Sequence, residues 1–235
     1  MRVAGVDLGN YFNGDGNGDF SGSLGATTAA EFTRQRDKVI AALLALDAAI
    51  LGVSRIENDP YGDASALTDL VSGLNAASSP GAYAAIDPGT GVTWGSAAAT
   101  VGIIYRPDRV IPVGTPQKPT TGAFAEPLLA GYVPMTQTFE EITWGERFTV
   151  VVYDLPTREN CPQEGLNLDQ GDGQGCWNAL RTEAATALLA WLDDDPTGSQ
   201  DPDFLWIGDA NAFAREDPIA TIVSGGYTDL TSSGA

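Results

Sequence analysis

The chain has 235 residues, of which 43% are hydrophobic, and no run approaches the roughly 18 apolar residues that a membrane-spanning helix needs. Its 31 acidic and 12 basic residues give a formal net charge of −19, which disfavours simple electrostatic binding to a nucleic acid backbone. Histidine is absent, so any catalytic chemistry must use other side chains. We expect a globular chain that is long enough to bury a full core.

The first part of the chain shows alternating strand and helix patterns. A short strand over 3–8 leads into a glycine-rich polar loop. Thr28 and Glu31 form a capping-box pattern at the start of an amphipathic helix. Residues 48–57 then indicate a buried strand, and Asp63 is the predicted cap of a second helix.

The second part continues the same alternation. Residues 100–106 and 147–155 are rich in β-branched side chains and are predicted strands. A third helix is predicted over 177–192, followed by an apolar strand over 204–207. Because no long Pro/Ser linker interrupts the alternation, we expect a single α/β domain over 1–235.

The only two cysteines, Cys161 and Cys176, flank a glycine-rich segment without apolar periodicity. A disulfide that closes a loop of this size would remove roughly 3 kcal/mol of chain entropy from the unfolded state. We therefore favour a disulfide and an oxidising, extracellular location, with two reduced thiols as the alternative. No signal peptide precedes Val3, so a leader has either been removed or is not part of this sequence.

The last predicted strand ends in a polar pair. Gly208 follows the apolar run, and Asp209 and Asn211 then stand two residues apart. On an extended chain such side chains point the same way, so a carboxylate and an amide share one small volume. The alternative is ordinary turn chemistry, for which Gly-Asp-x-Asn is well suited.

Several blocks, in this order, resemble the bacterial secreted nucleases of the endonuclease/exonuclease/phosphatase superfamily, which also includes pancreatic-type deoxyribonuclease and exonuclease III. They are LGVSRIENDPYG, GIIYRPDRV, ERFTVVV, CPQEGLNLDQGDGQGCWNALRTEAA and IGDANAFAREDPI. The resemblance implies a deoxyribonuclease I-like α/β fold, a sandwich of two mixed β-sheets with helices on the outer faces. It also implies metal-dependent hydrolysis of DNA or RNA phosphodiesters, with Mg²⁺ or Ca²⁺ as the cofactor.

The resemblance assigns roles to the strand-end residues and also reveals departures. Asp209 and Asn211 match the family's water-positioning Asp and phosphate-binding Asn. Asp7 stands where the family has an Asn, Arg55 where it has the metal-binding Glu, and Asp154 where it has a catalytic His. A guanidinium cannot ligate a cation and repels it. The other altered pocket positions are Ala97, Thr100, Tyr132, Tyr153, Pro156 and Arg158.

Arg55 admits two interpretations. It can pair with Asp209, Asp7 or Asp154 and turn a metal site into an ion-pair network, or it can bind an anionic ligand through its planar fork. We favour the pairing. Glu57 is a candidate substitute for the lost metal ligand.

The glycine-rich loop contains a second candidate metal site. Asp15, Asn17 and Asp19 resemble the alternating oxygen ligands of a calcium loop, but Phe20 stands where such a loop has glycine. A plain loop is the favoured interpretation. Five aromatic residues could line a pocket, but aromatics on strands more often belong to the core. They are Trp94, Tyr132, Trp144, Tyr153 and Trp206.

Three functions are compatible with these observations. The first is a nuclease whose metal site has moved, for instance to Asp7, Glu57 and Asp209. The second is a nuclease-like domain that has lost catalysis and serves as a binding or structural module, and the third is an engineered scaffold with a remodelled pocket. Because removing one group from a catalytic unit can cost a thousandfold or more, we favour loss of activity. The sequence also stops before the family's final Asp-His pair, so either another segment covers the sheet edge that this leaves or the chain is a fragment. A free edge would allow self-association.

Overall fold

The computed structural model of the protein describes residues 1–14, 19–20 and 22–231. Its elements are β1 (Val3–Tyr11), α1 (Ala29–Leu46), β2 (Ile50–Glu57), α2 (Ala66–Ala77), β3 (Ala84–Ala85), β4 (Ala99–Tyr105), β5 (Val110–Gln117), the 3-10 helix η1 (Gly122–Ala125), β6 (Met135–Glu141), β7 (Arg147–Asp154), α3 (Asn178–Asp193), β8 (Phe204–Asp209) and α4 (Asp217–Ser224). None of the described helices is long and apolar enough to cross a lipid bilayer.

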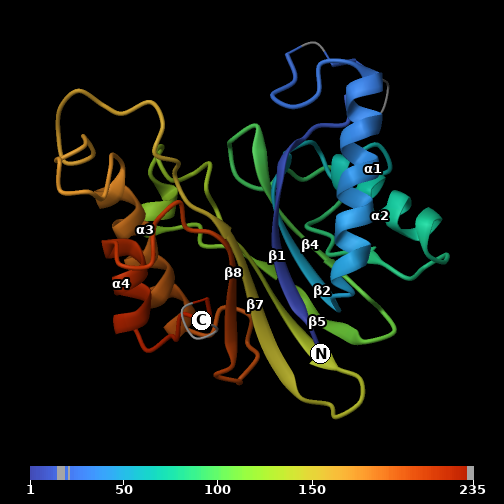
Figure 1. The fold of residues 1–235 in the computed structure, drawn as a ribbon. Helices are drawn as coiled ribbons and strands as arrows, with labels where there is room; N and C mark the ends of the chain where they lie inside the picture. The colour runs from blue at the N-terminus through green and yellow to red at the C-terminus, as the bar shows by residue number, and fades with distance from the viewer. Residues whose placement is uncertain (15–18, 21, 232–235) are drawn as a thin grey trace.

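The strands form two mixed four-stranded sheets, in the orders β1-β2-β4-β3 and β5-β6-β7-β8. The sheets pack face to face, with α1 and α2 over the outer face of the first sheet and α3 and α4 over the outer face of the second (Figure 1). The predicted fold class, a sandwich of two mixed sheets with outer helices, is confirmed.

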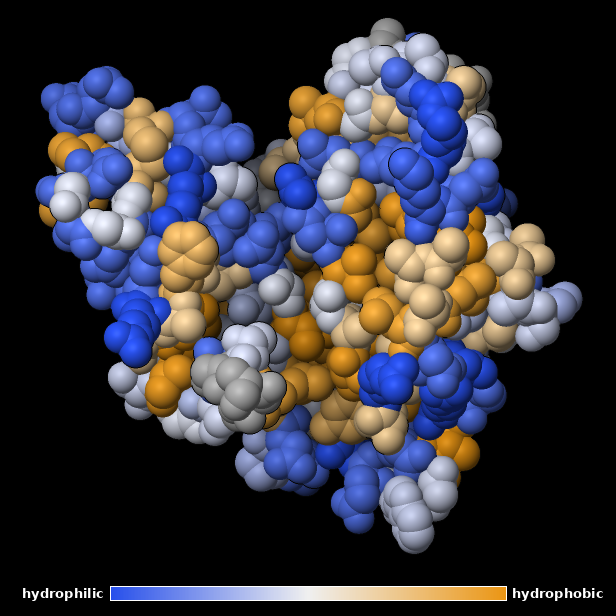
Figure 2. All heavy atoms as spheres, in the orientation of Figure 1, coloured by the Kyte–Doolittle hydropathy of each residue, from blue (hydrophilic) through white to orange (hydrophobic). Residues whose placement is uncertain are grey.

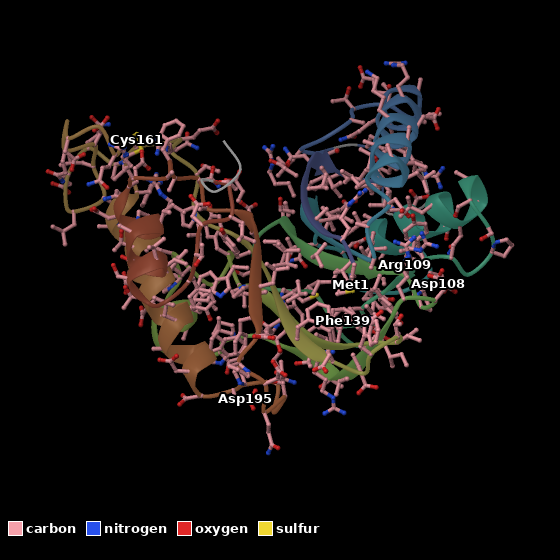
Figure 3. The ribbon with its side chains drawn as sticks, turned by 60° about the horizontal axis from the view of Figure 1, so that its bottom comes forward. Met1, Asp108, Arg109, Phe139, Cys161 and Asp195 are labelled. Atoms are coloured by element: carbon pink, nitrogen blue, oxygen red, sulfur yellow. A yellow bond between two sulfur atoms is a disulfide. The ribbon has the colours of Figure 1, made fainter. Side chains whose placement is uncertain are left out.

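The space between the sheets is filled by apolar side chains of the inner faces. Ile50, Val152 and Phe139 are fully buried there, and Figure 3 shows Phe139 in the middle of the sandwich. Gly52 lets the sheets approach closely, because a Cβ at this position would lie 2.5 Å from the Cδ1 atom of Ile207. The core thus fixes the distance between the strand ends that carry the candidate site.

Some predicted boundaries are corrected by the structure. The first strand runs past residue 8 to Tyr11, so part of the expected loop is strand. The second helix is capped by Ser65, whose hydroxyl accepts a hydrogen bond from the N–H of Thr68, and not by Asp63. The strands β5 and β6 and the helix α4 were not predicted.

The predicted capping box at the start of α1 is present in a shifted form. Thr28 is the N-cap, and its Oγ1 accepts a hydrogen bond from the N–H of Glu31 at 3.2 Å. The carboxylate of Glu31 accepts from the N–H of Thr27, one residue earlier than in the standard motif. Two N–H groups that the helix itself cannot satisfy are therefore paired.

We expect Thr28→Ala to lower the free energy of unfolding by about 1 kcal/mol, because the N–H of Glu31 loses its acceptor. The measurement is urea denaturation. Thr33→Ala is the matched control, since Thr33 lies within α1, where alanine is the better helix former. Equal losses in the two variants would contradict a capping role for Thr28.

Candidate cleft at the strand ends

The carboxyl-terminal ends of β1, β2, β7 and β8 meet at one end of the sandwich, where Figure 2 shows the molecule hollowed between its two halves. A cavity of about 380 Å³ lies there. Asp7, Arg55, Asp154, Asp209 and Asn211 all line it. The structure thus brings together all five strand-end residues to which the sequence resemblance assigned a role or a departure.

Main-chain pairing explains why these residues meet. β1 and β2 run parallel, with Asp7 opposite Ser54, next to Arg55. β7 and β8 also run parallel, with Asp154 directly opposite Asp209. The carboxylates of Asp154 and Asp209 therefore lie on neighbouring strand ends of the second sheet. The carboxylate of Asp7 and the guanidinium of Arg55 lie on neighbouring strand ends of the first.

Arg55 forms a bidentate ion pair with Asp7. Its Nε donates to Oδ1 of Asp7 at 2.6 Å and its Nη2 to Oδ2 at 2.5 Å. This hydrogen bonding raises the pKa of Arg55. Of the three partners considered from the sequence, the structure selects Asp7.

The backbone at Arg55 is unusual for a strand. Its φ is 54°, in the left-handed region, and the β2 register with β4 shifts between Val53 and Ile56. A bulge of this kind re-aims a side chain at the end of a strand. The guanidinium consequently reaches across to Asp7 on the neighbouring strand.

Asn211 links the two carboxylates of the second sheet. Its main-chain N–H donates to Oδ1 of Asp209 at 2.7 Å. Its side-chain Nδ2 donates to Oδ1 of Asp154 at 3.2 Å and to the carbonyl of Leu155 at 2.7 Å. Asp209 and Asn211 therefore form the turn that the sequence predicted as one alternative, and they also line the cleft.

The pKa of Asp154 is raised to about 7. Burial is the main cause, and the nearby carboxylates of Asp209 and Asp7 add to it, whereas Arg55 and the hydrogen bond from Asn211 act in the opposite direction. Near neutral pH this carboxyl is divided between its acid and its carboxylate form. It can donate a hydrogen bond in the first form and only accept in the second.

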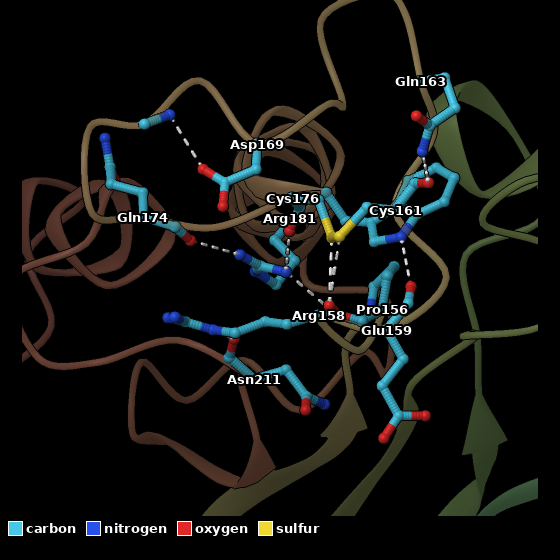
Figure 4. The surroundings of a disulfide bond; sticks show 12 residues. Pro156, Arg158, Glu159, Cys161, Gln163, Asp169, Gln174, Cys176, Arg181 and Asn211 are labelled. Carbon is cyan, nitrogen blue, oxygen red and sulfur yellow. Dashed lines mark hydrogen bonds between the residues drawn. A yellow bond between two sulfur atoms is a disulfide. The ribbon is translucent and has the colours of Figure 1, made fainter.

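Arg158 forms one wall of the cleft and connects it to the disulfide. Its Nε donates to the carbonyl of Asn211 at 3.0 Å, its Nη2 pairs with the buried Glu216, and its guanidinium lies 4.6 Å from the ring centre of Phe213. The Cys161–Cys176 disulfide, as predicted, is formed. Figure 4 shows the carbonyl oxygen of Arg158 beside the two sulfur atoms.

A second cavity of about 250 Å³ adjoins the first and shares Arg55 and Asp154 with it. Its walls include Ala97, Val133 and Tyr132, so it is largely apolar. Burial raises the pKa of the Tyr132 phenol, and Asp154 adds to this shift. The altered positions Ala97, Thr100 and Tyr132 therefore do line the cleft region.

Other predicted site residues lie elsewhere. The carboxylate of Glu57 accepts a hydrogen bond from the N–H of Asn13 at 2.9 Å, and Glu57 does not line the cavity that holds Asp7 and Asp209. The relocated set of three metal ligands is not brought together. Among the described residues, no group of three or more His, Cys, Asp or Glu side chains is arranged to hold a metal ion.

The calcium-loop candidates and the aromatic candidates have different outcomes. Asp15 and Asn17 lie outside the described residues, whereas Asp19 is described and lies in a loop. Trp94 and Tyr153 are buried, and Trp206 is half-buried. Trp144 is 80% exposed at the turn between β6 and β7, and so lies far from a core position.

Four residues of the cleft wall, among them Ala212, were not singled out from the sequence. Thr157, Glu159 and Phe213 line the cavity, and Phe213 stacks on Arg158. The sequence could have indicated Thr157 and Glu159 by their position in the chain, because they lie between the end of β7 and the predicted disulfide. No local pattern marks Phe213, which is brought in by the turn after β8.

No protein-family model matches the sequence, and no curated protein is significantly similar to it. Solved structures with the same fold include an endonuclease/exonuclease/phosphatase family protein from Bacteroides thetaiotaomicron (TM-score 0.59, 15% identity, 95% of this chain and 68% of that one). A mannosyl-6-phosphatase from the same organism gives a TM-score of 0.59 at 16% identity, over 95% and 70% of the two chains. The human Nocturnin catalytic domain with bound sulfate gives 0.54 at 19% identity, and this chain spans 62% of it. The chain therefore has the fold of the endonuclease/exonuclease/phosphatase proteins.

Proposed function

We propose that this chain is a nuclease-like domain that has lost metal-dependent hydrolysis and whose cleft serves binding. The observation that carries the proposal is the bidentate Arg55–Asp7 pair. It occupies the position where the sequence resemblance places the metal-binding Glu. Both oxygens of Asp7 are engaged by the guanidinium, so this carboxylate has no free oxygen directed at an ion.

The cleft does not fit a divalent cation. Mg²⁺ and Ca²⁺ require about six or more oxygen ligands, usually including ionised carboxylates. Arg55 adds a positive charge at the centre of the cleft, and Asp154 is partly protonated near pH 7. Two other carboxylates, Asp209 and Glu159, line the cleft, and these two alone supply fewer oxygen ligands than such an ion requires.

The test compares the protein with a variant in which the ion pair is converted into ligands. Asp7→Asn together with Arg55→Glu restores the side chains that the family has at these two positions. We expect no Mg²⁺ or Mn²⁺ binding by the parent in isothermal titration, and measurable binding by the double variant. Asp7→Asn alone is the control, because it frees Arg55 without supplying a ligand.

Catalysis is measured on the same samples with plasmid DNA and RNA. We expect cleavage at background level for the parent. Metal-dependent cleavage by the parent that disappears in Asp209→Ala would overturn the proposal and support a rebuilt active site instead. Recovery of metal binding without cleavage in the double variant is the expected result, because the family's histidines are still missing.

An extracellular location is part of the proposal. The disulfide supports it, because disulfides persist in oxidising compartments. Nucleic acid is the ligand that the resemblance suggests, but the net charge of −19 opposes it. If DNA binds, we expect binding only at a high concentration of a divalent salt, which screens this charge.

A further inference from the structure

The cleft at the strand ends has two chambers that meet at the same residues. The cavity of about 380 Å³ is polar, and the cavity of about 250 Å³ beside it is largely apolar. Arg55, Asp154 and Thr157 line both of them, so Asp154 stands where the chambers meet. A single ligand can therefore place a polar group in one chamber and an apolar group in the other.

The polar chamber has an excess of negative charge. Four carboxylates and two guanidinium groups line it. Each guanidinium already has a carboxylate partner, because Arg55 pairs with Asp7, and Arg158 with the buried Glu216. In the described part of the chain, no Lys or Arg forms an ion pair with the other three carboxylates, which are those of Asp154, Glu159 and Asp209. The chamber therefore favours a cationic ligand over an anionic one.

The carboxylates of Asp154 and Asp209 each keep one oxygen available. The main-chain N–H of Asn211 donates to Oδ1 of Asp209, its side chain donates to Oδ1 of Asp154, and no described donor bonds either Oδ2 atom. Figure 4 shows the Glu159 carboxylate pointing away from the disulfide, towards the side on which Asn211 lies. An ammonium group has three N–H donors and no acceptor, so a few carboxylate oxygens satisfy it, whereas Mg²⁺ or Ca²⁺ needs about six ligands.

The apolar chamber suits a small hydrocarbon or aromatic group. Val101 and Val133 are buried in its walls, and Leu24 stands at its exposed side. Ala97 and Gly131 face each other there, since a Cβ at Gly131 would lie 3.0 Å from the Cβ of Ala97. These two small residues leave room that larger side chains would fill.

We propose that the cleft binds a small organic molecule that carries a primary ammonium group on an aromatic or hydrocarbon body. The ammonium donates to the oxygens of Asp154 and Asp209 in the polar chamber, and the body fills the apolar chamber. This inference rests on the proposed binding role of the cleft and names the chemical class of its ligand. A carboxylate or phosphate in place of the ammonium would add an anion beside Asp154 and Asp209 while both guanidinium groups are already paired.

The probe is phenethylamine, titrated calorimetrically into the full chain at pH 8. We expect saturable binding, with affinity lower by about tenfold or more for 2-phenylethanol, which lacks the charge, and for ethylamine, which lacks the ring. Equal binding of either analogue, tighter binding of phenylacetate, or no saturable binding at millimolar concentration would overturn the proposal. Equally tight binding of N-acetyl-lysine amide would assign the cleft to a lysine side chain of a partner protein and overturn the small-molecule ligand.

Each chamber has its own variant. Asp154→Asn together with Asp209→Asn keeps the shape but removes two charges, and affinity for phenethylamine should fall about tenfold or more. Asp169→Asn with Asp172→Asn removes two charges from the exposed disulfide loop and should leave affinity unchanged. Ala97→Leu fills the apolar chamber and should weaken phenethylamine but not ethylamine. Equal losses in the two charge variants, or no loss in Ala97→Leu, would overturn the proposal.

The outcome for this ligand is separate from that for the proposed function. Metal-dependent cleavage by the parent would overturn the loss of hydrolysis. A parent that neither binds Mg²⁺ nor cleaves DNA, and that also fails to bind phenethylamine, would overturn the ammonium ligand alone.

Discussion

Asp154→Asn is expected to stabilise the folded chain at pH 8 and, by a clearly smaller amount, at pH 5. The pKa of Asp154 is about 7 in the folded chain and about 3.9 in an unfolded chain. Between these values the folded state holds the extra proton, so the parent loses stability as pH rises from about 4 to about 7. Asparagine cannot ionise, so the variant does not lose stability in this way as the pH rises.

The size of the effect follows from the same shift. Three pKa units correspond to about 4 kcal/mol, which is a ceiling because the partly exposed cleft relaxes around the charge. Urea unfolding of the parent and the variant at pH 5 and pH 8 measures it. Asp172→Asn, in an exposed loop, is the control and should show no pH-dependent gain. A gain of equal size at both pH values would mean that Asp154 is not the titrating group.

The parts of the cleft that depend on residues close together in the chain could be predicted from the sequence. Asp209 and Asn211 follow an apolar run by a fixed offset, and their turn is formed by their own main chain and side chains. Asp154 ends a strand that its β-branched content predicts, and parallel pairing then sets it opposite Asp209. Period and composition suffice for the strand and the turn, whereas the place of Asp154 in the site was what the family resemblance implied.

The partner of Arg55 could not be chosen from the sequence. Three carboxylates were available, and the bulge that turns Arg55 towards Asp7 depends on pairing between β2 and β4, whose residues are more than 40 positions apart in the chain. Long-range register decides the choice, and no local pattern encodes it.

Two errors in the elements have local physical reasons. β5 contains Pro112 and Pro116, which argue against a strand in general but are tolerated at the end of a sheet, where β5 lies. The cap of α2 was placed at Asp63 because Asp and Ser are equally good N-caps. The carboxylate of Asp59 accepts the N–H of Ala66, and this contact favours a start at Ser65.

Cys161→Ser together with Cys176→Ser is expected to lower the free energy of unfolding by about 3 kcal/mol, because the two residues close a loop with a separation of 15. The effect should not be uniform over the molecule. The fully buried Arg181 donates to the carbonyls of Cys176, Gln174 and Pro156, so the loop, α3 and the end of β7 are held at one point.

Arg158 extends this connection to the cleft through its bonds to Asn211 and Glu216. We therefore expect faster hydrogen exchange over 209–216 in the serine variant, and unchanged exchange in the distant helix α1. Dithiothreitol should reproduce the change in the parent and have no effect on the variant. If the free energy falls but exchange over 209–216 stays the same, the disulfide stabilises only its own loop, and the shape of the cleft depends on the strand ends alone.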